Sequence, residues 1–351
     1  MRALVLAGGE GSRLRPLTHT QAKQLIPVAG QPILFHALDA IREAGITEVG
    51  IVIGHTGPEV RVAVGDGSRW DLHVTYLEQE APLGLAHAVM TAADFVRGQP
   101  FLMYLGDNVL LEGVTRFVRE FERARPDAQI LLTHVSEPEH FGVAVLEGER
   151  VVRLVEKPRE FISDVALVGV YLFDDTILDA CATLSPSWRG EYEITEAIQW
   201  LIDQGKTVRA EMVDGYWKDT GRPEDLLEAN RMLLATREVA VVGTLEDSEV
   251  SGIVVVGPDT QVRGSRLIGP VVIGTGCRIE GSTIGPDVSL EADCTVIDSE
   301  IRNSIVMQGC SINGVDALEG SILGRSVEVR HAGQRHAHRL VVGDQSVVEV
   351  D

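Results

Sequence analysis

A glycine-rich turn followed by basic side chains stands near the start of the chain. It carries Gly8, Gly9 and Gly11, and the basic residues Arg13 and Lys23 come soon after it. Glycine backbone N–H groups can approach phosphate oxygens because no side chain blocks them, and a guanidinium group can bind two such oxygens at once. Since the whole chain has a formal net charge of -21, this local cationic turn predicts a binding site for a phosphate-bearing ligand.

The turn matches neither of two widespread phosphate-binding motifs. The dinucleotide motif GxGxxG would need a glycine at Leu14, and the mononucleotide motif GxxxxGK[ST] has no counterpart here. These absences weigh against a dehydrogenase of the dinucleotide-binding type and against a P-loop ATPase.

Two aspartates occupy positions that suit a divalent cation. Asp107 and Asn108 follow Gly106 at the end of an apolar stretch, and Asp219 lies in a second short motif, Trp217 to Gly221. Mg²⁺ binds one or two carboxylates together with phosphate oxygens, so the two aspartates can share one metal ion. An ordinary turn is the alternative for each, because Asp and Asn are common where strands end.

Further polar residues can bind the rest of such a ligand. Glu156 and Lys157 are neighbours after an apolar stretch, where the carboxylate can hold a sugar hydroxyl and the ammonium a phosphate. Arg189 precedes one predicted helix, and Gln79 and Gly84 flank the start of another. The glutamine amide can read the edge of a base. The alternatives are surface ion pairs of small energetic weight and a surface glutamine.

Alternating apolar and amphipathic segments predict the elements that position these residues. Up to about Thr236 the pattern is that of βαβ units around a mostly parallel sheet. Strands are expected at 3–7, 48–53, 74–77, 101–105, 129–135, 151–155 and 165–173. Helices are expected at 33–44, 84–95, 114–123, 194–204 and 223–235. Ligands of such folds bind beyond the carboxyl ends of the strands, where both the glycine turn and Asp107 fall.

After about Arg237 the helical pattern ends and isolated aliphatic residues recur every five or six positions. This is the hexapeptide repeat of a parallel β-helix. The aliphatic positions are Val256, Val262, Ile268, Ile273, Ile279, Ile284, Leu290, Val296, Ile301, Val306, Ile312 and Leu318. A column of small residues gives the coil length through its spacings of 17, 17, 16 and 16: Thr260, Cys277, Cys294, Cys310 and Ser326. We therefore interpret these cysteines as buried, reduced fillers of the β-helix interior rather than metal ligands or disulfides.

Composition narrows the class of protein. The length of 351 residues predicts two or three domains. The hydrophobic fraction of 44% is that of an ordinary globular protein. The net charge of -21 argues against a nucleic-acid-binding surface. Neither a membrane-spanning stretch nor a signal peptide is recognisable, so a cytoplasmic protein that does not bind membranes is expected.

Taken together and in this order, the motifs resemble those of the sugar-1-phosphate nucleotidylyltransferases, and most closely the long-form thymidylyltransferase branch. The resemblance covers essentially the whole chain and is carried by Leu6 to Thr18, Lys23 to Pro27, Leu105 to Asn108, Glu156 to Pro158 and Trp217 to Gly221. It implies a Rossmann-like α/β catalytic domain with a mixed, mostly parallel sheet at residues 1–236. A left-handed parallel β-helix would follow at 237–351.

The resemblance also implies a role for each matching residue. The nucleotide, dTTP, would be bound by Gly8, Gly9, Gly11, Ser12, Arg13, Gln79 and Gly84. The sugar phosphate, glucose 1-phosphate, would be bound by Asn108, Gly142, Glu156, Lys157, Tyr171 and Arg189. Asp107 and Asp219 would hold Mg²⁺, and Arg13 and Lys23 would neutralise phosphate charge during transfer. Phe141 departs from the tyrosine that many relatives have before the glycine, so any contact through that hydroxyl is in doubt.

The implied reaction needs no general base. A sugar phosphate is largely dianionic at neutral pH, because its second pKa is about 6, so its oxygen can attack the α-phosphorus directly. The protein would align two polyanions and reduce their repulsion. This agrees with the absence of Ser/His/Asp and HExxH patterns in the sequence.

Several alternatives stay open. The same fold can act on UTP or on an amino-sugar phosphate. The β-helix can carry an acyltransferase activity, although its repeats show no histidine apart from the cluster His331, His336 and His338. A non-enzymatic scaffold is a third possibility, against which the intact charged motifs speak. A purely structural β-helix would serve subunit assembly, and a homo-oligomer is expected.

Overall fold

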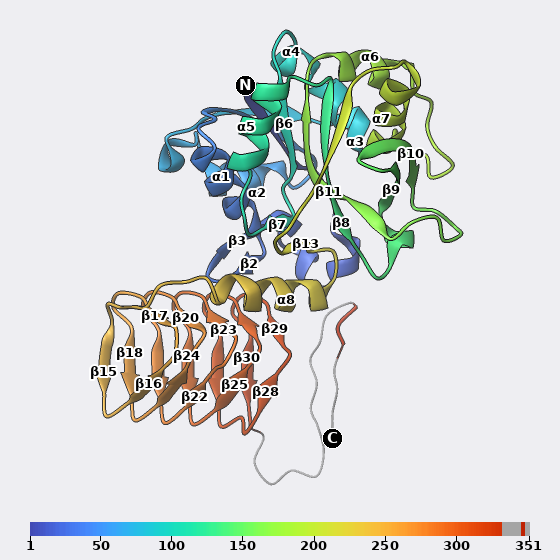
Figure 1. Ribbon diagram of the computed structural model, residues 1–351. Helices are drawn as coiled ribbons and strands as arrows, with labels where there is room; N and C mark the ends of the chain where they lie inside the picture. Colours follow the sequence, from blue (N-terminus) through green and yellow to red (C-terminus); the bar gives the residue numbers. More distant parts are fainter. Residues whose placement is uncertain (332–344, 348–351) are drawn as a thin grey trace. The chain divides into compact units, whose positions relative to one another are not determined.

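The computed structural model describes residues 1–331 and 345–347 (Figure 1). Two of the three clustered histidines, His336 and His338, lie outside the described residues. Contacts between α-carbons divide the chain into two compact units. The first unit comprises Met1–Glu10, Ala22–Leu25 and Ile33–Asp219. The second comprises Gly11–Gln21, Ile26–Pro32 and the chain from Thr220 onward.

The first unit is built on a nine-stranded mixed sheet. Its main path has the order β10-β9-β11-β6-β1-β4-β5, while β8 pairs with β11 and β12. The strands are β1 (Arg2–Ala7), β4 (Glu48–Ile53), β5 (His73–Glu78), β6 (Phe101–Leu105), β8 (Ala128–His134), β9 (Gly142–Glu147), β10 (Arg150–Glu156), β11 (Val165–Phe173) and β12 (Val208–Met212). Strand β1 lies parallel to β4 and β6, whereas β11 is antiparallel to its neighbours β6, β8 and β9. The predicted mixed α/β sheet is confirmed.

Helices cover both faces of this sheet, as Figure 1 shows. They are α1 (Ile33–Glu43), α2 (Gly57–Val64), α3 (Leu85–Thr91), α4 (Ala93–Val96), α5 (Thr115–Ala124), α6 (Thr176–Thr183) and α7 (Ile194–Asp203). Alternate residues of β1 enter two separate cores: Ala3 and Val5 pack in one with α1 and α5, and Leu4 and Leu6 in the other with α3 and α7. A strand buried on both faces must be apolar throughout, which is the pattern seen in the sequence.

Most predicted elements agree with the structure to within a residue or two. One expected helix, at 84–95, is broken at Ala92 into α3 and α4. The N–H of Ala92 still bonds to the carbonyl of Ala88 at 3.1 Å. No glycine or proline marks the break, so the sequence pattern carries no sign of it.

The second unit contains three parallel sheets that coil as a β-helix (Figure 1). One sheet consists of β14 (Ala240–Val241), β17 (Val254–Val256), β20 (Val271–Ile273), β23 (Val288–Leu290), β26 (Ile305–Val306) and β29 (Ile322–Leu323). The second consists of β15 (Thr244–Glu246), β18 (Gln261–Arg263), β21 (Arg278–Glu280), β24 (Thr295–Ile297), β27 (Ser311–Asn313) and β30 (Glu328–Arg330). The third consists of β16 (Glu249–Ser251), β19 (Arg266–Ile268), β22 (Thr283–Ile284), β25 (Glu300–Arg302) and β28 (Leu318–Glu319).

The registers confirm the predicted coil. Val262 pairs with Ile279, Ile279 with Val296, and Val296 with Ile312. One predicted position differs, because Leu267 rather than Ile268 packs inside. A strand alternates its faces at every residue, so a one-residue offset moves the side chain to the outer face.

The cysteine column is buried, as predicted, and its thiols are free. Each thiol lies near a backbone carbonyl further along the chain: Cys277 Sγ is 3.1 Å from the oxygen of Glu291, and Cys310 Sγ is 3.0 Å from that of Gly324. Thr260 makes the same contact through its hydroxyl, at 2.6 Å from Gly274. The thiols therefore fill space and serve weakly as hydrogen-bond donors. Ser326, the last member of the column, is exposed.

Helix α8 (Pro223–Leu234) belongs to this second unit by its contacts, together with the short β2 (Pro27–Val28) and β3 (Gln31–Pro32). The buried side chain of Asn230 accepts a hydrogen bond from the backbone N–H of Ala29 at 2.8 Å and one from the Ser289 hydroxyl. Contact thus separates the units at Thr220, whereas the sequence predicted a functional boundary after residue 236. These are different criteria, and the functional boundary stays a prediction.

Candidate functional site

Strand pairing brings the two predicted metal-binding aspartates together. Strand β7 (Asn108–Leu110) runs antiparallel to β13 (Trp217–Asp219), and Asp219 stands opposite Asn108. Asp107, one residue before β7, is therefore close to Asp219 although 112 positions separate them, 219 minus 107. The Lys23 ammonium pairs with Asp107 and lies 3.8 Å from the Asp219 carboxylate.

These three charges form a nearly buried cluster. Lys23 lies in the 3-10 helix η3 (Lys23–Leu25) and is only 7% exposed. Burial favours the neutral form of Asp107. The Lys23 ammonium and hydrogen bonds from Lys23 and Asn108 outweigh it, so the pKa of Asp107 lies below its usual value. Asp107 is thus a carboxylate at working pH.

Asn108 orients Asp107. Its amide nitrogen donates to Asp107 Oδ1 at 3.0 Å. Its oxygen accepts from the indole N–H of Trp217 at 2.7 Å and from the backbone N–H of Gly169 at 3.2 Å. The side chain is 1% exposed, so in this structure its amide serves the protein, and the predicted contact with the sugar is an untested proposal.

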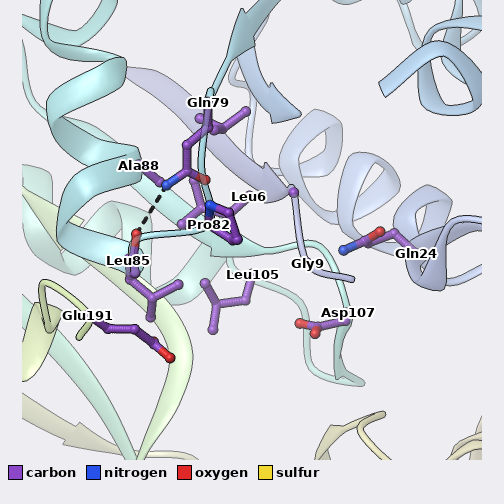
Figure 2. A pocket seen from close by; sticks show the side chains of 13 residues that line it. Leu6, Gly9, Gln24, Gln79, Pro82, Leu85, Ala88, Leu105, Asp107 and Glu191 are labelled. Atoms are coloured by element: carbon purple, nitrogen blue, oxygen red, sulfur yellow. Dashed lines mark hydrogen bonds between the residues drawn. The ribbon is translucent and has the colours of Figure 1, made fainter. Parts of the chain in front are cut away.

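A cavity of about 250 Å³ lies beyond the carboxyl ends of β1, β5 and β6 (Figure 2). The residues that line it include the predicted nucleotide-site residues Gly8, Gly9, Gln79 and Gly84, together with Asp107. The sequence predicted a ligand site at this edge of the sheet, and the structure has a cavity there.

Other lining residues were not singled out from the sequence. Gln24, Leu85 and Glu191 are among them. Gln24 is 2% exposed, and its side-chain oxygen has no hydrogen-bond partner among the described residues. A buried orphan acceptor at a cavity is a candidate ligand contact. The only sequence sign was its place beside Lys23.

Gly84 can only be glycine in this fold. Its φ is +102°, and a β-carbon added there would lie 2.6 Å from the backbone oxygen and 2.9 Å from the backbone nitrogen of Tyr192. The close approach joins the start of α3 to the loop that carries Arg189 and Glu191. Hydrogen bonds from Tyr192 N–H to Leu83 and from Ala86 N–H to Tyr192 hold the two segments.

The predicted sugar-phosphate residues include a cluster around Arg189. Its guanidinium lies 2.7 Å from Glu191, 3.2 Å from Glu193 and 3.6 Å from Glu156. Burial, and then the charge of Glu193, raises the pKa of Glu156 above its usual value, against the opposing effects of Lys157, Thr195 and Arg189. Arg189 is the cation that three carboxylates share.

The other predicted sugar-site residues adjoin this cluster. Lys157 Nζ is 3.9 Å from Glu156. A β-carbon on Gly142 would lie 3.0 Å from the Glu156 carboxylate. Tyr171 is buried and stacks on Phe173, and burial raises the pKa of its hydroxyl. Phe141, which stands where many relatives have tyrosine, packs edge-on against Trp217, with the ring centroids 5.6 Å apart.

The rest of the basic turn lies in the second unit. Gly11 has φ +63° and precedes the 3-10 helix η1 (Ser12–Leu14). Ser12 and Arg13 are exposed. The Arg13 guanidinium would be 2.8 Å from a β-carbon on Gly221, and within the described residues no carboxylate forms an ion pair with it. An exposed guanidinium of this kind is available for an anion.

The residues at the cluster fit a divalent cation. Two carboxylates converge on one positive group, the Lys23 ammonium, and such hard oxygen donors suit Mg²⁺ when phosphate and water complete its ligands. Among the described residues there is no group of three or more His, Cys, Asp or Glu side chains that could hold a metal alone. A ligand phosphate would therefore have to supply part of the coordination.

Comparisons with known proteins identify relatives of this chain. A family model described as nucleotidyl transferase matches residues 2–236. The glucose-1-phosphate thymidylyltransferases of Streptomyces griseus and Streptomyces antibioticus are 53% and 51% identical, and each alignment covers 100% of this chain and 99% of the relative. A Bacillus anthracis structure described as a glucose-1-phosphate thymidylyltransferase matches with a TM-score of 0.63 and 34% identity, over 66% of this chain and 94% of that one.

No helix in the described part of the chain is long and apolar enough to cross a membrane. The family match spans the whole mixed sheet, with the Lys23, Asp107 and Asp219 cluster and the strand-end cavity, and the relatives extend the likeness through the β-helix. The chain belongs to the nucleotidyl transferase family, and its full-length relatives there are glucose-1-phosphate thymidylyltransferases.

Proposed function

We propose that this protein joins dTTP and glucose 1-phosphate to give dTDP-glucose and pyrophosphate. One observation carries the proposal: the cavity at the strand ends is lined by a glycine turn, a glutamine amide and the carboxylate of Asp107. These groups suit a phosphate chain, a base edge and a metal-bound phosphate respectively. The full-length likeness to two glucose-1-phosphate thymidylyltransferases supports the choice of substrates.

The nucleotide occupies the cavity in this proposal. Gly8 and Gly9 approach its phosphates through their backbone, with Gly11, Ser12 and Arg13 of the same turn. Gln79 and the backbone at Gly84 read the pyrimidine. The support is that Gly8, Gly9, Gln79 and Gly84 all line the cavity.

The sugar phosphate binds at the Arg189 cluster. The Glu156 carboxylate holds sugar hydroxyls, and Lys157 and Arg189 hold the phosphate, with Asn108, Gly142 and Tyr171 completing the site. Arg189 carries three carboxylate neighbours. An arriving phosphate therefore takes over some of its hydrogen bonds, chiefly those with the less buried Glu191.

The reaction is a single displacement at phosphorus. A phosphate oxygen of glucose 1-phosphate forms a bond to the α-phosphorus of dTTP, and the bond from that phosphorus to the bridging β-phosphate oxygen breaks, with its electron pair leaving on pyrophosphate. The attacking oxygen carries no proton to remove. Lys23 and Arg13 stabilise the negative charge that builds up on the α-phosphate oxygens.

Asp107 and Asp219 would hold Mg²⁺, which when bound lowers the repulsion between the two anionic substrates. Asn108 keeps the Asp107 carboxylate in place by its 3.0 Å hydrogen bond. Lys23 pairs with both carboxylates and offsets one of their two negative charges before substrates bind.

A substrate panel tests the proposal. Release of pyrophosphate is measured with dTTP, UTP, dCTP, dATP and dGTP, each paired with glucose 1-phosphate, glucosamine 1-phosphate and galactose 1-phosphate. The highest kcat/KM is expected for dTTP with glucose 1-phosphate. A preference for UTP or for an amino-sugar phosphate would assign the protein a different substrate pair within the same family. Turnover of acetyl-CoA with glucosamine 1-phosphate would show that the protein also has an acyltransferase activity.

We infer that residues 1–236 carry this activity and that the β-helix from 237 assembles copies of the chain. Its first strands, β14, β15 and β16, are terminal in their sheets, and Val239 and Val242 beside them are exposed. An apolar sheet end of this kind favours pairing with a second copy. The four reduced cysteines suit the cytoplasm.

A further inference from the structure

The side chain of Gln79, the residue proposed to read the base, contacts His87. His87 was not among the site residues predicted from the sequence. The Gln79 amide nitrogen lies 2.8 Å from Nδ1 of His87, in helix α3. The same nitrogen donates to the backbone oxygen of Gly84 at 3.3 Å. Figure 2 shows this second bond and, on the other side of the amide, the Gln79 oxygen.

The two contacts determine which way the amide faces. A backbone carbonyl can only accept a hydrogen bond, so the group facing Gly84 must be the amide nitrogen. The nitrogen has two protons, and the second points at His87, whose Nδ1 must then be the unprotonated acceptor. A His87 ring with its proton on Nε2 offers Nδ1 as that acceptor. Because both amide protons are engaged, Gln79 presents only its oxygen to a ligand.

Packing fixes the His87 ring as well. The ring stacks on Tyr192, with centroids 6.2 Å apart and planes at 28°. The backbone of Tyr192 in turn bonds to Ala86 and Leu83. The Gln79 oxygen lies beside Gly8, where an added β-carbon would be 3.4 Å from it, and both residues line the cavity.

We propose that His87 is a positioning residue that makes Gln79 a pure hydrogen-bond acceptor and so selects bases with an imide N–H. Thymine and uracil carry a proton on N3 and can donate it to the Gln79 oxygen. Cytosine has an unprotonated N3, which would face the Gln79 oxygen acceptor to acceptor. Without His87, only the longer 3.3 Å bond to Gly84 opposes a turn of the amide that would let it donate to cytosine. The inference rests on the proposed function and adds a cause for its base preference.

A double-mutant cycle tests the inference, with kcat/KM for dTTP and for dCTP as readouts and glucose 1-phosphate as second substrate. His87→Leu removes the acceptor and should lower the dTTP to dCTP ratio about ten-fold, the scale of one neutral hydrogen bond. His87→Asn keeps an acceptor near the position of Nδ1 and should retain most of the ratio. In a Gln79→Leu background, His87→Leu should have no further effect on the ratio.

The outcomes separate the inference from the function on which it rests. If the wild-type protein turns over neither dTTP nor UTP, the proposed function fails. If the wild type prefers dTTP but folded His87→Leu keeps the ratio within two-fold, or the two changes are additive, the inference alone is overturned. Equal losses in His87→Asn and His87→Leu would also overturn it, since ring packing rather than the acceptor would then matter. Thermal melting of each variant confirms that it is folded.

Discussion

Among single residues, Lys23 has the greatest electrostatic weight in the candidate site. It is almost fully buried, and its ammonium contacts Asp107 and lies 3.8 Å from Asp219. A buried charge that loses its partner is strongly unfavourable. Lys23 therefore offsets one of the two carboxylate charges, and a bound cation would offset the other during the reaction.

Removing either charge should abolish most of the activity. Lys23→Ala and Asp107→Asn are each expected to lower kcat by about 10²-fold or more, the effect of losing one electrostatic contact in the transition state. Pyrophosphate release at saturating substrates measures it. Lys206→Ala is a matched control, because that lysine is exposed and pairs only with Asp127 at 3.4 Å among the described contacts. A folded Lys23→Ala protein with near-normal kcat would refute the role.

The residue types at the site could be predicted from the sequence, but not their partners. Asn108 was expected to bind sugar, yet its amide is engaged by Asp107, Trp217 and Gly169. Arg189 was expected to bind phosphate, and here it contacts three carboxylates. Such partners come from strand pairing and loop packing over long sequence separations, which spacing along the chain does not encode.

Among the elements, the strand ends were predictable because strands buried on both faces of a sheet are continuous apolar runs. β4, β6 and β11 have the predicted limits. Helices α2 and α6 were not expected. Each is only eight residues long and carries little amphipathic pattern, so tertiary packing rather than local preference decides them.

The start of α3 should be intolerant of any side chain at Gly84. Gly84→Ala forces a β-carbon against the Tyr192 backbone at a φ of +102°. We expect the KM for the nucleotide to rise about ten-fold or more, because strain of this kind costs on the order of 1–3 kcal/mol. Gly98→Ala is the control: its φ is +77°, but no atom of the described residues lies within 4 Å of the added carbon. Equal nucleotide KM values in the two variants would contradict the account.

The contact between α5 and β12 should make stability fall as pH rises. Burial, and then the hydrogen bond and charge of Glu120, raises the pKa of Glu211 to about 7. In the unfolded chain a glutamate titrates near 4.3. The folded protein therefore holds the Glu211 proton more tightly than the unfolded chain does. The contribution of Glu211 to the free energy of unfolding is complete at low pH and is lost as pH rises from about 4.3 to 7.

Glu211→Gln tests that linkage by removing the titration. The variant should melt at a higher temperature than the wild type at pH 8, and the difference should shrink or reverse at pH 4.5. Glu122→Gln, on the exposed face of α5, is the control and should shift little at either pH. An advantage for Glu211→Gln that does not change with pH would exclude the proposed linkage.

At the scale of the whole molecule, the β-helix was recognisable because its coils repeat every 16 or 17 residues. The packing of α8 against the β-helix was not recognisable from the sequence. Asn230 joins that helix to the loop at Ala29 and to Ser289, and such a buried polar link gives no periodic signal. This is why contact divides the chain at Thr220 and not at the end of α8.

The exposed first coil should mediate assembly. Val242 is 70% exposed beside the terminal strands of the three sheets. Val242→Asp places a charge in the proposed contact between copies, so light scattering should show a smaller particle than for the wild type. Val62→Asp, at an 87% exposed position of α2 in the first unit, should leave the mass unchanged. A monomeric wild type, or an unchanged mass for Val242→Asp, would refute the prediction that copies of the chain assemble through this coil.

In the proposed reaction, one active site joins two phosphate-bearing substrates without a covalent intermediate. The decisive experiment uses a phosphorothioate analogue of dTTP, with sulfur at one configuration of the α-phosphorus, together with glucose 1-phosphate and Mg²⁺. Phosphorus NMR of the product reports its configuration. A single attack by the sugar phosphate predicts a dTDP-glucose analogue with inverted configuration and one equivalent of pyrophosphate. Retained configuration, or release of pyrophosphate without a sugar nucleotide, would contradict the account.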